Sequence, residues 1–306
     1  VTVLLLTELK HTFTEFAQRM KNDEMITLAK FLAISGIILP MLPHKNLIPD
    51  INLTPYSIWL ATVVVSGISY LSYLLKRYVF HESGVLVSGI IGGLYSSTAT
   101  ISVLARKSRK ASAQEANEYV AAMLLAVSMM FLRFMILILI FSREIFMSIY
   151  PYLLIMSVVA AVVAWFIHSR QRRSKDLSAD SEEEDSSNPL EFKVALIFAT
   201  LFVIFTVLTH YTLVYAGTGG LNLLSFVSGL SDITPFILNL LQNTGSVAVL
   251  IVVACSMQAI ISNILVNMFY ALFFAGKGSK LRPWILGGFG TVIGVNLVLL
   301  LFFYFI

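Results

Sequence analysis

The sequence predicts an all-α polytopic membrane protein with two inverted internal repeats and an extra N-terminal helix. Each repeat is expected to hold three spanning helices and one re-entrant or broken hairpin. The 306 residues are 58% hydrophobic and 12% charged, whereas soluble domains carry about 25% charged residues. Long apolar runs recur without the period-2 alternation of a barrel. Two motif-bearing segments also repeat at a constant offset of 136 residues.

Nine apolar segments are long enough to be membrane elements. They cover residues 26–42, 56–75, 84–105, 119–141, 145–167, 192–213, 220–241, 247–275 and 284–305. The first ends at the break PMLP, so we expect a peripheral helix and an external loop over 26–55. Residues 1–25 resemble the end of a preceding helix and an amphipathic connector, as in a fragment of a longer chain.

The repeated segments are GVLVSGIIGGLYSSTAT at 84–100 and GLNLLSFVSGLSDITPF at 220–236. The matched pairs include Gly93 with Gly229, Ser96 with Asp232, and Thr98 with Thr234. A glycine followed by hydroxyl residues, placed twice in apolar segments, is typical of the interrupted elements of transporters with internal repeats. The neighbouring pairs Gly89 with Gly93 and Gly290 with Gly294 predict close helix packing.

The distribution of positive charge favours hairpins at these two segments. If all nine segments cross the membrane, the Lys and Arg residues divide evenly, ten on each side. If both motif segments enter and leave on one side, eighteen lie on one face, two (Lys45 and Arg143) lie opposite, and Arg133 is inside the membrane. Cytoplasmic loops normally hold such an excess. The predicted units are repeat 56–167, a charged linker at 168–191, and repeat 192–306.

Two ionisable residues are expected at membrane depth, where each costs about 2.5 to 3.5 kcal/mol on insertion scales. Arg133 lies in the middle of an apolar run, and Asp232 lies in the second motif. We expect both to face one polar cavity; whether they pair is left open, as is a purely structural salt bridge.

Amides and hydroxyls complete the predicted path for an ion or solute. Aligning Ser128 with Ser262 places Arg133 opposite Asn267 and Met129 opposite Asn263, and the two asparagines share a helical face. They can bind a ligand or clamp helices. The candidate hydroxyls are Ser96, Ser97, Thr98, Thr100, Ser231 and Thr234.

Other classes of function lack their motifs. HExxH, GxSxG, CxxC and P-loop patterns do not occur, and one intramembrane Asp does not make an aspartyl dyad. We therefore expect no enzyme and no cofactor. The single cysteine, Cys255, excludes an internal disulfide. The sequence has no basic patch interleaved with aromatic residues, so it does not predict a nucleic-acid partner.

The motifs GGLYSSTATISVLARKSR, MFLRFMILI, NPLEFKVAL, SGLSDITPF and ISNILVN resemble a prokaryotic family called domain of unknown function 4010. Its members often follow an MgtC/SapB-like membrane domain. The resemblance covers about 26–300 and implies an inner-membrane location and an MgtC-like domain upstream. By pattern, Ser96, Ser97, Thr98, Arg133, Asp232 and Asn263 occupy the family's polar positions. The family pattern has a Lys where this chain has Asn267, which argues against a second buried cation.

The leading hypothesis is a transporter or channel for a small ion or polar solute, with a midplane site between the two hairpins. Arg133 favours an anion or carboxylate unless Asp232 neutralises it, and a protonatable Asp232 would instead couple transport to protons. The alternative is a non-transporting membrane scaffold or regulatory partner whose buried polar residues are structural. The expected partners are the lipid bilayer and the transported solute; a homo-oligomer is left open, because packing glycines do not determine the oligomeric state.

Overall fold

The computed structural model describes residues 22–49, 51–80, 84–109, 116–170, 192–242, 247–276, 279 and 281–305. Apart from a single bridge between Ile48 and Ile51, the regular structure in these residues is helical. The helices are α2 (Asn22–Met41), α3 (Pro55–Leu74) with the π-helical turn η1 (Leu75–Val79), α4 (Val85–Lys107), α5 (Ala116–Phe141), α6 (Arg143–Ser169), α7 (Phe192–Ser228), α8 (Ile233–Gln242), α9 (Val249–Ala275) and α10 (Arg282–Phe305). The predicted all-α class is confirmed.

Eight of the described helices are long and apolar enough to cross a membrane, and α8 is too short. Large apolar side chains such as Trp165 and Val298 are exposed on the outer faces, at 69% and 66%. A protein in lipid can expose such residues, because lipid tails are as apolar as they are. The chain is therefore a multi-pass membrane protein.

Local signals explain several helix boundaries. Thr54 and Ser57 form a capping box at the start of α3, and Pro55 occupies its first turn. Ser142 caps α6 by accepting a hydrogen bond from the Ile145 amide at 3.4 Å. Pro40 lies one residue before the end of α2, near the predicted break. The predicted connector at 1–25 lies outside the described residues up to residue 21, as does the linker at 168–191 beyond residue 170.

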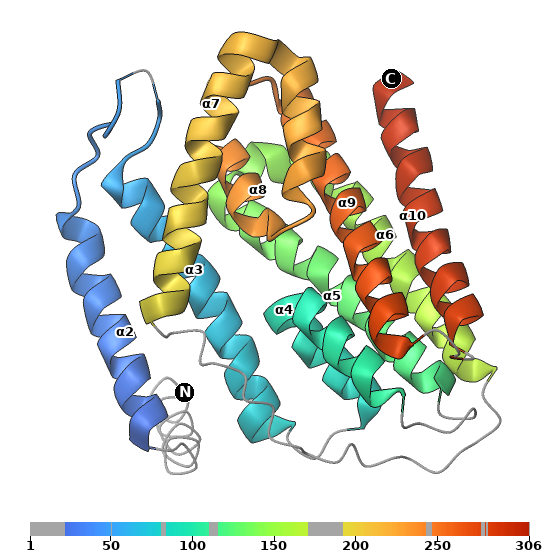
Figure 1. Cartoon of the computed structure of the whole chain (residues 1–306). Helices are drawn as coiled ribbons and strands as arrows, with labels where there is room; N and C mark the ends of the chain where they lie inside the picture. The colour runs from blue at the N-terminus through green and yellow to red at the C-terminus, as the bar shows by residue number, and fades with distance from the viewer. Residues whose placement is uncertain are drawn as a thin grey trace, which may run out of the picture.

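The predicted segments 192–213 and 220–241 are not separated by a loop. The first segment and the start of the second both belong to α7. This helix bends at Gly217 (φ 59°, ψ −151°), a conformation that only glycine adopts readily. A Cβ added at Gly220 would lie 2.8 Å from Thr212 Cγ2, although residues eight apart in a straight helix are about 12 Å apart. The second part of α7 therefore turns back beside the first, as the bend near the top of Figure 1 shows.

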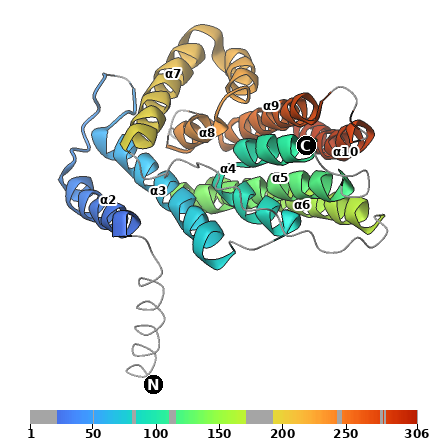
Figure 2. The same cartoon turned by 60° about the horizontal axis from the view of Figure 1, so that its bottom comes forward.

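The core of the bundle is built from helix pairs. The α5 and α6 pair packs along the α9 and α10 pair (Figure 2). Fully buried aromatic rings fill the space between the elements, among them Phe131, Phe202, Phe236 and Phe289. The short α8 is held against the first part of α7, where Phe205 and Phe236 meet edge to face at 5.7 Å.

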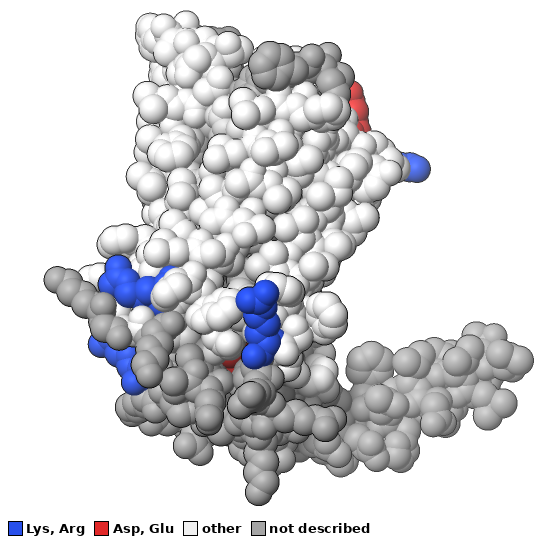
Figure 3. All heavy atoms as spheres, turned by 90° about the vertical axis from the view of Figure 1, so that its right-hand side faces the viewer, with Lys and Arg blue, Asp and Glu red and all other residues white. Residues whose placement is uncertain are grey.

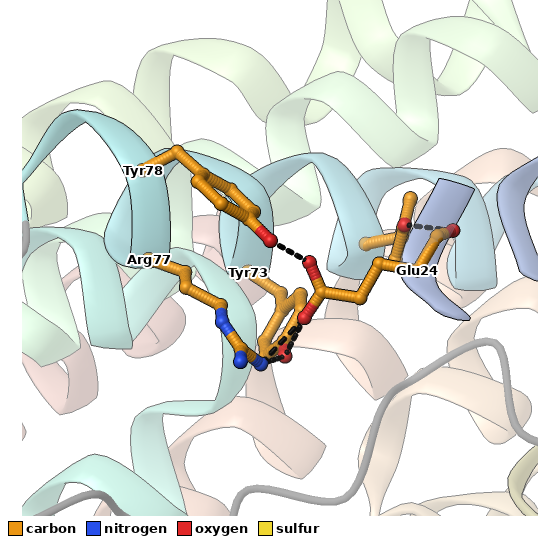
Figure 4. Close-up of polar contacts among 5 residues, drawn as sticks. Glu24, Tyr73, Arg77 and Tyr78 are labelled. Carbon is orange, nitrogen blue, oxygen red and sulfur yellow. Dashed lines mark hydrogen bonds and ion pairs between the residues drawn. The ribbon is translucent and has the colours of Figure 1, made fainter. Parts of the chain in front are cut away.

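Helix α2 lies at the side of the bundle beside α3 (Figures 1 and 2). Its Glu24 side chain is almost fully buried and pairs with Arg77 at 2.5 Å. The same carboxylate accepts hydrogen bonds from the hydroxyls of Tyr73, at 2.9 Å, and Tyr78 (Figure 4). Tyr70 donates to the Glu24 backbone carbonyl at 3.1 Å. This Glu24 cluster attaches the peripheral helix to α3 and η1.

Basic residues gather at one end of the molecule, here called the basic end. Helices α3, α4 and α6 finish at the lower end of Figure 1 and α10 begins there. Their terminal cations are Lys76, Arg77, Arg106, Lys107, Arg170 and Arg282. Blue side chains correspondingly mark the lower end in Figure 3, below a broad uncharged band.

Candidate functional site

The chain reverses direction at Ser96, inside α4. Ser96 has extended backbone angles (φ −158°, ψ 106°) between two helical halves. A Cβ added at Gly92 would lie 2.5 Å from Thr100 Oγ1, eight residues along the chain, so the two halves lie against each other. The Ser96 hydroxyl accepts a hydrogen bond from the Ala99 amide at 3.3 Å and caps the second half.

A second interruption lies between α7 and α8, over residues 229–232. Asp232 Oδ1 accepts a hydrogen bond from the Thr234 amide at 2.9 Å, so Asp232 caps α8. Asp232 is exposed, and it lines the cavity described below. Ser96 and Asp232, which the sequence offset pairs, therefore hold matching positions at two helix breaks.

Glycines allow each broken element to approach the next long helix. A Cβ added at Gly93 would lie 2.5 Å from Ala126 Cα, and one at Gly229 would lie 2.7 Å from Ser262 Oγ. In both repeats the contacting residues are 33 apart in sequence, and Ser225 contacts Gln258 at the same spacing, at 2.8 Å. Because Gly93 matches Gly229, their contact residues Ala126 and Ser262 also match each other. The alignment of Ser128 with Ser262 was wrong by two residues, since apolar helices offer many similar alignments.

Gly89 and Gly93 confirm the predicted close packing, because both face the α5 backbone. The prediction was wrong for Gly290 and Gly294, where an added Cβ meets no described atom within 4 Å. These two glycines lie on a face of α10 that leaves space for a side chain.

Backbone carbonyls at each break accept a hydrogen bond from a following long helix. Arg133 Nη1 on α5 donates to the Tyr95 carbonyl at 2.8 Å. Asn263 Nδ2 on α9 lies 3.4 Å from the carbonyls of both Ser231 and Gly229. Tyr95 and Ser231 are also 136 residues apart. Carbonyls at a helix end lack their intrahelical donor, so these side chains stabilise both breaks.

A cavity of about 370 Å³ lies where the two breaks meet. Its polar lining residues are Ser66, Ser69, Tyr95, Ser96, Ser97, Thr98, Arg133, Ser231, Asp232, Thr234, Asn263 and Tyr270. Apolar side chains from the first part of α7, such as Phe198 and Leu201, close one wall. Segments distant in sequence thus build one cavity that combines polar groups at the breaks with apolar walls.

Arg133 and Asp232 both line this cavity but do not form an ion pair with each other within 4.0 Å. The Arg133 guanidinium also donates to Ser69 Oγ at 3.4 Å, and its Nε atom is buried without a hydrogen-bond partner. One oxygen of Asp232 is engaged by the Thr234 amide. The cavity therefore holds one positive and one negative group, each with unused hydrogen-bonding capacity.

Eight of the ten predicted path residues line the cavity, and Thr100 and Asn267 do not. Thr100 packs against Gly92 inside the first hairpin. Asn267 is fully buried and donates to Asn263 Oδ1 at 3.1 Å, so it orients the amide that contacts the second break. In the described part of the chain, no three His, Cys, Asp or Glu side chains come together as a metal site requires.

Sequence reasoning missed Ser66, Ser69, Tyr95 and Tyr270. Tyr270 lies seven residues after Asn263 and three after Asn267, so helical periodicity placed all three on one face. Tyr95 could have been found from its offset to Ser231. Ser69 gave no such signal, because its contact with Arg133 depends on how α3 packs.

The family profile described as domain of unknown function (DUF4010) matches residues 63–275, well over half of the chain. The chain belongs to this family. The match to DUF4010 contains both helix breaks, Arg133, Asp232 and Asn263, and it leaves α2 and α10 outside. An uncharacterized protein of Aquifex aeolicus (strain VF5) is 26% identical over 220 residues, covering 71% of this DUF4010 chain and 94% of that protein. No solved structure was found to match the chain.

Proposed function

We propose that the protein is a membrane transporter or channel that carries a small ion or polar solute through the cavity between the two breaks. One observation carries this proposal. Helix breaks that lie 136 residues apart open into a single compartment that holds Arg133 and Asp232. Irregular backbone is costly at membrane depth unless it is buried in protein or lines an aqueous cavity. Paired interrupted helices at a midplane site are the arrangement by which secondary transporters bind their solutes.

The two broken elements act as re-entrant hairpins of two inverted repeats, 56–167 and 192–306. Both halves of α4 lie toward the basic end, whereas residues 218–242 lie toward the other end (Figure 1). The matching contacts of Gly93 with Ala126 and of Gly229 with Ser262 support the repeat. Rocking of one repeat against the other would open the cavity to each side in turn.

The basic end faces the cytoplasm in this proposal, because positive residues concentrate in cytoplasmic loops. We place the protein in the cytoplasmic membrane of a prokaryote, with transport rather than catalysis as its role. An MgtC-like domain upstream and a homo-oligomer stay predictions. Cysteines at Ser112, which lies outside the described residues, and at exposed Ala248 test the topology in a Cys255→Ala background, because inverted hairpins place them on opposite sides and nine simple crossings place them on one side. They should label from opposite sides; labelling from one side contradicts inverted hairpins.

Flux into vesicles tests the function. The purified chain is reconstituted and screened with potassium, chloride, acetate and glycine, and a transported solute should exceed its rate in protein-free vesicles. Arg133→Ala and Asp232→Asn should abolish that flux, whereas Arg143→Ala and Glu144→Gln, at exposed residues of α6, should preserve it. A scaffold or regulatory partner predicts no flux at all. Normal flux in both cavity variants would contradict the assigned site.

A further inference from the structure

The charges of the cavity point to the class of solute that it takes. Arg133 and Asp232 line the same compartment, yet no ion pair joins them within 4.0 Å. Arg133 is partly buried, where an uncompensated charge is costly, and Asp232 is exposed and lines the cavity. A ligand that carries a single charge would compensate one of these two residues and leave the other without a charged partner.

Arg133 has hydrogen-bond donors that are not used by the protein. A guanidinium has five N–H groups, and those of Arg133 make one hydrogen bond to the Tyr95 carbonyl and one to Ser69 Oγ. The Nε group is buried without a partner. Guanidinium groups bind carboxylates through paired hydrogen bonds, so Arg133 is suited to hold an anionic group.

The first break strengthens that preference. The second half of α4 starts at this break, and its N-terminus carries partial positive charge. Its cap, Ser96, is an uncharged hydroxyl. At the second break the cap of α8 is the Asp232 carboxylate, which already compensates the N-terminus of that helix. The side of the cavity at Ser96 and Arg133 is thus electropositive, and the side at Asp232 is electronegative.

We propose that the cavity binds a small zwitterion that carries one carboxylate and one ammonium group. The carboxylate lies at Arg133 and the N-terminus that follows Ser96, and the ammonium group lies at Asp232. A zwitterion satisfies both charges and adds no net charge to the compartment. The volume of about 370 Å³ is near the lower end of small-molecule sites, which favours a compact solute. This inference deepens the proposed function and uses the same site.

Binding to the purified full chain in detergent tests the inference without requiring flux. Isothermal titration compares glycine, β-alanine, γ-aminobutyrate and 5-aminovalerate, in which the two charges lie progressively further apart. Butyrate and butylamine are the controls, because each has the chain of γ-aminobutyrate and only one of its charges. At least one zwitterion should bind about tenfold more tightly than either control, as expected for hydrogen bonds to charged groups. Equal binding of butyrate, or no binding of any zwitterion, would overturn the inference.

Charge-neutralising variants give the second arm. Asp232→Asn keeps a capping oxygen, so the protein should fold, lose about tenfold in affinity for the preferred zwitterion and gain affinity for butyrate. Arg133→Gln should shift the preference toward butylamine. The exposed variants Arg143→Gln and Glu144→Gln should change neither. An Asp232→Asn protein that binds the zwitterion unchanged would contradict the placement of the ammonium group. Zwitterion binding without flux would support this inference and contradict the transport function. Flux of a singly charged solute without zwitterion binding would support the transport function and contradict this inference.

Discussion

The guanidinium of Arg133 donates a hydrogen bond of 2.8 Å to the carbonyl of Tyr95, directly before the break at Ser96. Asn263 makes the matching contact to the Ser231 carbonyl, directly before Asp232. Each break leaves carbonyls without their helical donors, and each receives a donor from the next long helix. One half of the protein uses a cation for this purpose and the other uses an amide. Together with the Asp232 carboxylate at the second break, this difference makes the shared cavity electrically asymmetric.

The two roles of Asp232, as a helix cap and as a charge, can be separated. Asp232→Ala removes both roles and should lower the free energy of unfolding by about 1 kcal/mol. Asp232→Asn keeps an oxygen that can accept from the Thr234 amide, so its stability should stay near that of the unaltered protein. Flux should be lost in both variants. Thermal unfolding in detergent and vesicle flux measure the two properties.

Ser142→Ala is the matched control, because Ser142 caps α6 away from the cavity. It should lose about 1 kcal/mol of stability, as another cap does, and retain flux. An Asp232→Asn protein that transports normally would show that the charge has no part in the path.

The glycines at the breaks should tolerate no side chain. Gly93→Ala brings a Cβ to 2.5 Å from Ala126 Cα, and Gly229→Ala brings one to 2.6 Å from the Ala259 carbonyl. The contacted atoms belong to helix backbone, so helices must move apart, which costs about 1 to 3 kcal/mol. Thermal unfolding should show both losses.

Gly290→Ala is the comparison, since an added Cβ there meets no described atom within 4 Å. Alanine has a higher helix propensity than glycine, by up to about 1 kcal/mol, so this variant should be as stable as the parent or more so. Equal stability of all three variants would contradict the close approach of the broken elements to α5 and α9.

The Glu24 cluster should determine how firmly α2 stays on the bundle. Glu24→Gln removes the ion pair with Arg77 and weakens the hydrogen bonds from Tyr73 and Tyr78. Hydrogen bonds to charged groups contribute about 1.5 to 3 kcal/mol each, so α2 should open more often. Hydrogen exchange should rise in α2 and stay constant in α9. Glu144→Gln, at an exposed position, serves as the control. Identical hydrogen exchange in α2 for both variants would contradict the claim that the Glu24 cluster holds α2 on the bundle.

The sequence predicted the parts of this architecture that repeat or that follow from composition. Apolar run lengths located the spanning helices, and the constant offset matched Ser96 with Asp232, which now occupy the caps of two broken helices. The position of Arg133 in an apolar run was enough to predict that it lines a cavity, because charges at membrane depth are costly.

Contacts between distant segments could not be predicted in the same way. Periodicity shows which residues share a helix face but not which face meets which neighbour. Thr100 was expected in the cavity and instead packs on Gly92, because the chain folds back at Ser96. Asn267 was placed beside the solute path and instead supports Asn263. The contact of Glu24 with Arg77 joins the peripheral helix to α3 and η1 and has no counterpart in the other half to reveal it.

Solvent access to the two breaks tests the central claim most directly. Thr98→Cys and Ser231→Cys, made separately in a Cys255→Ala background, place thiols on the cavity lining beside the two breaks. Phe131→Cys, at a fully buried core position, is the negative control. A small charged thiol reagent should modify both cavity cysteines in membrane-embedded protein and leave the core cysteine untouched. If neither cavity cysteine reacts in folded protein, the breaks do not enclose an aqueous path.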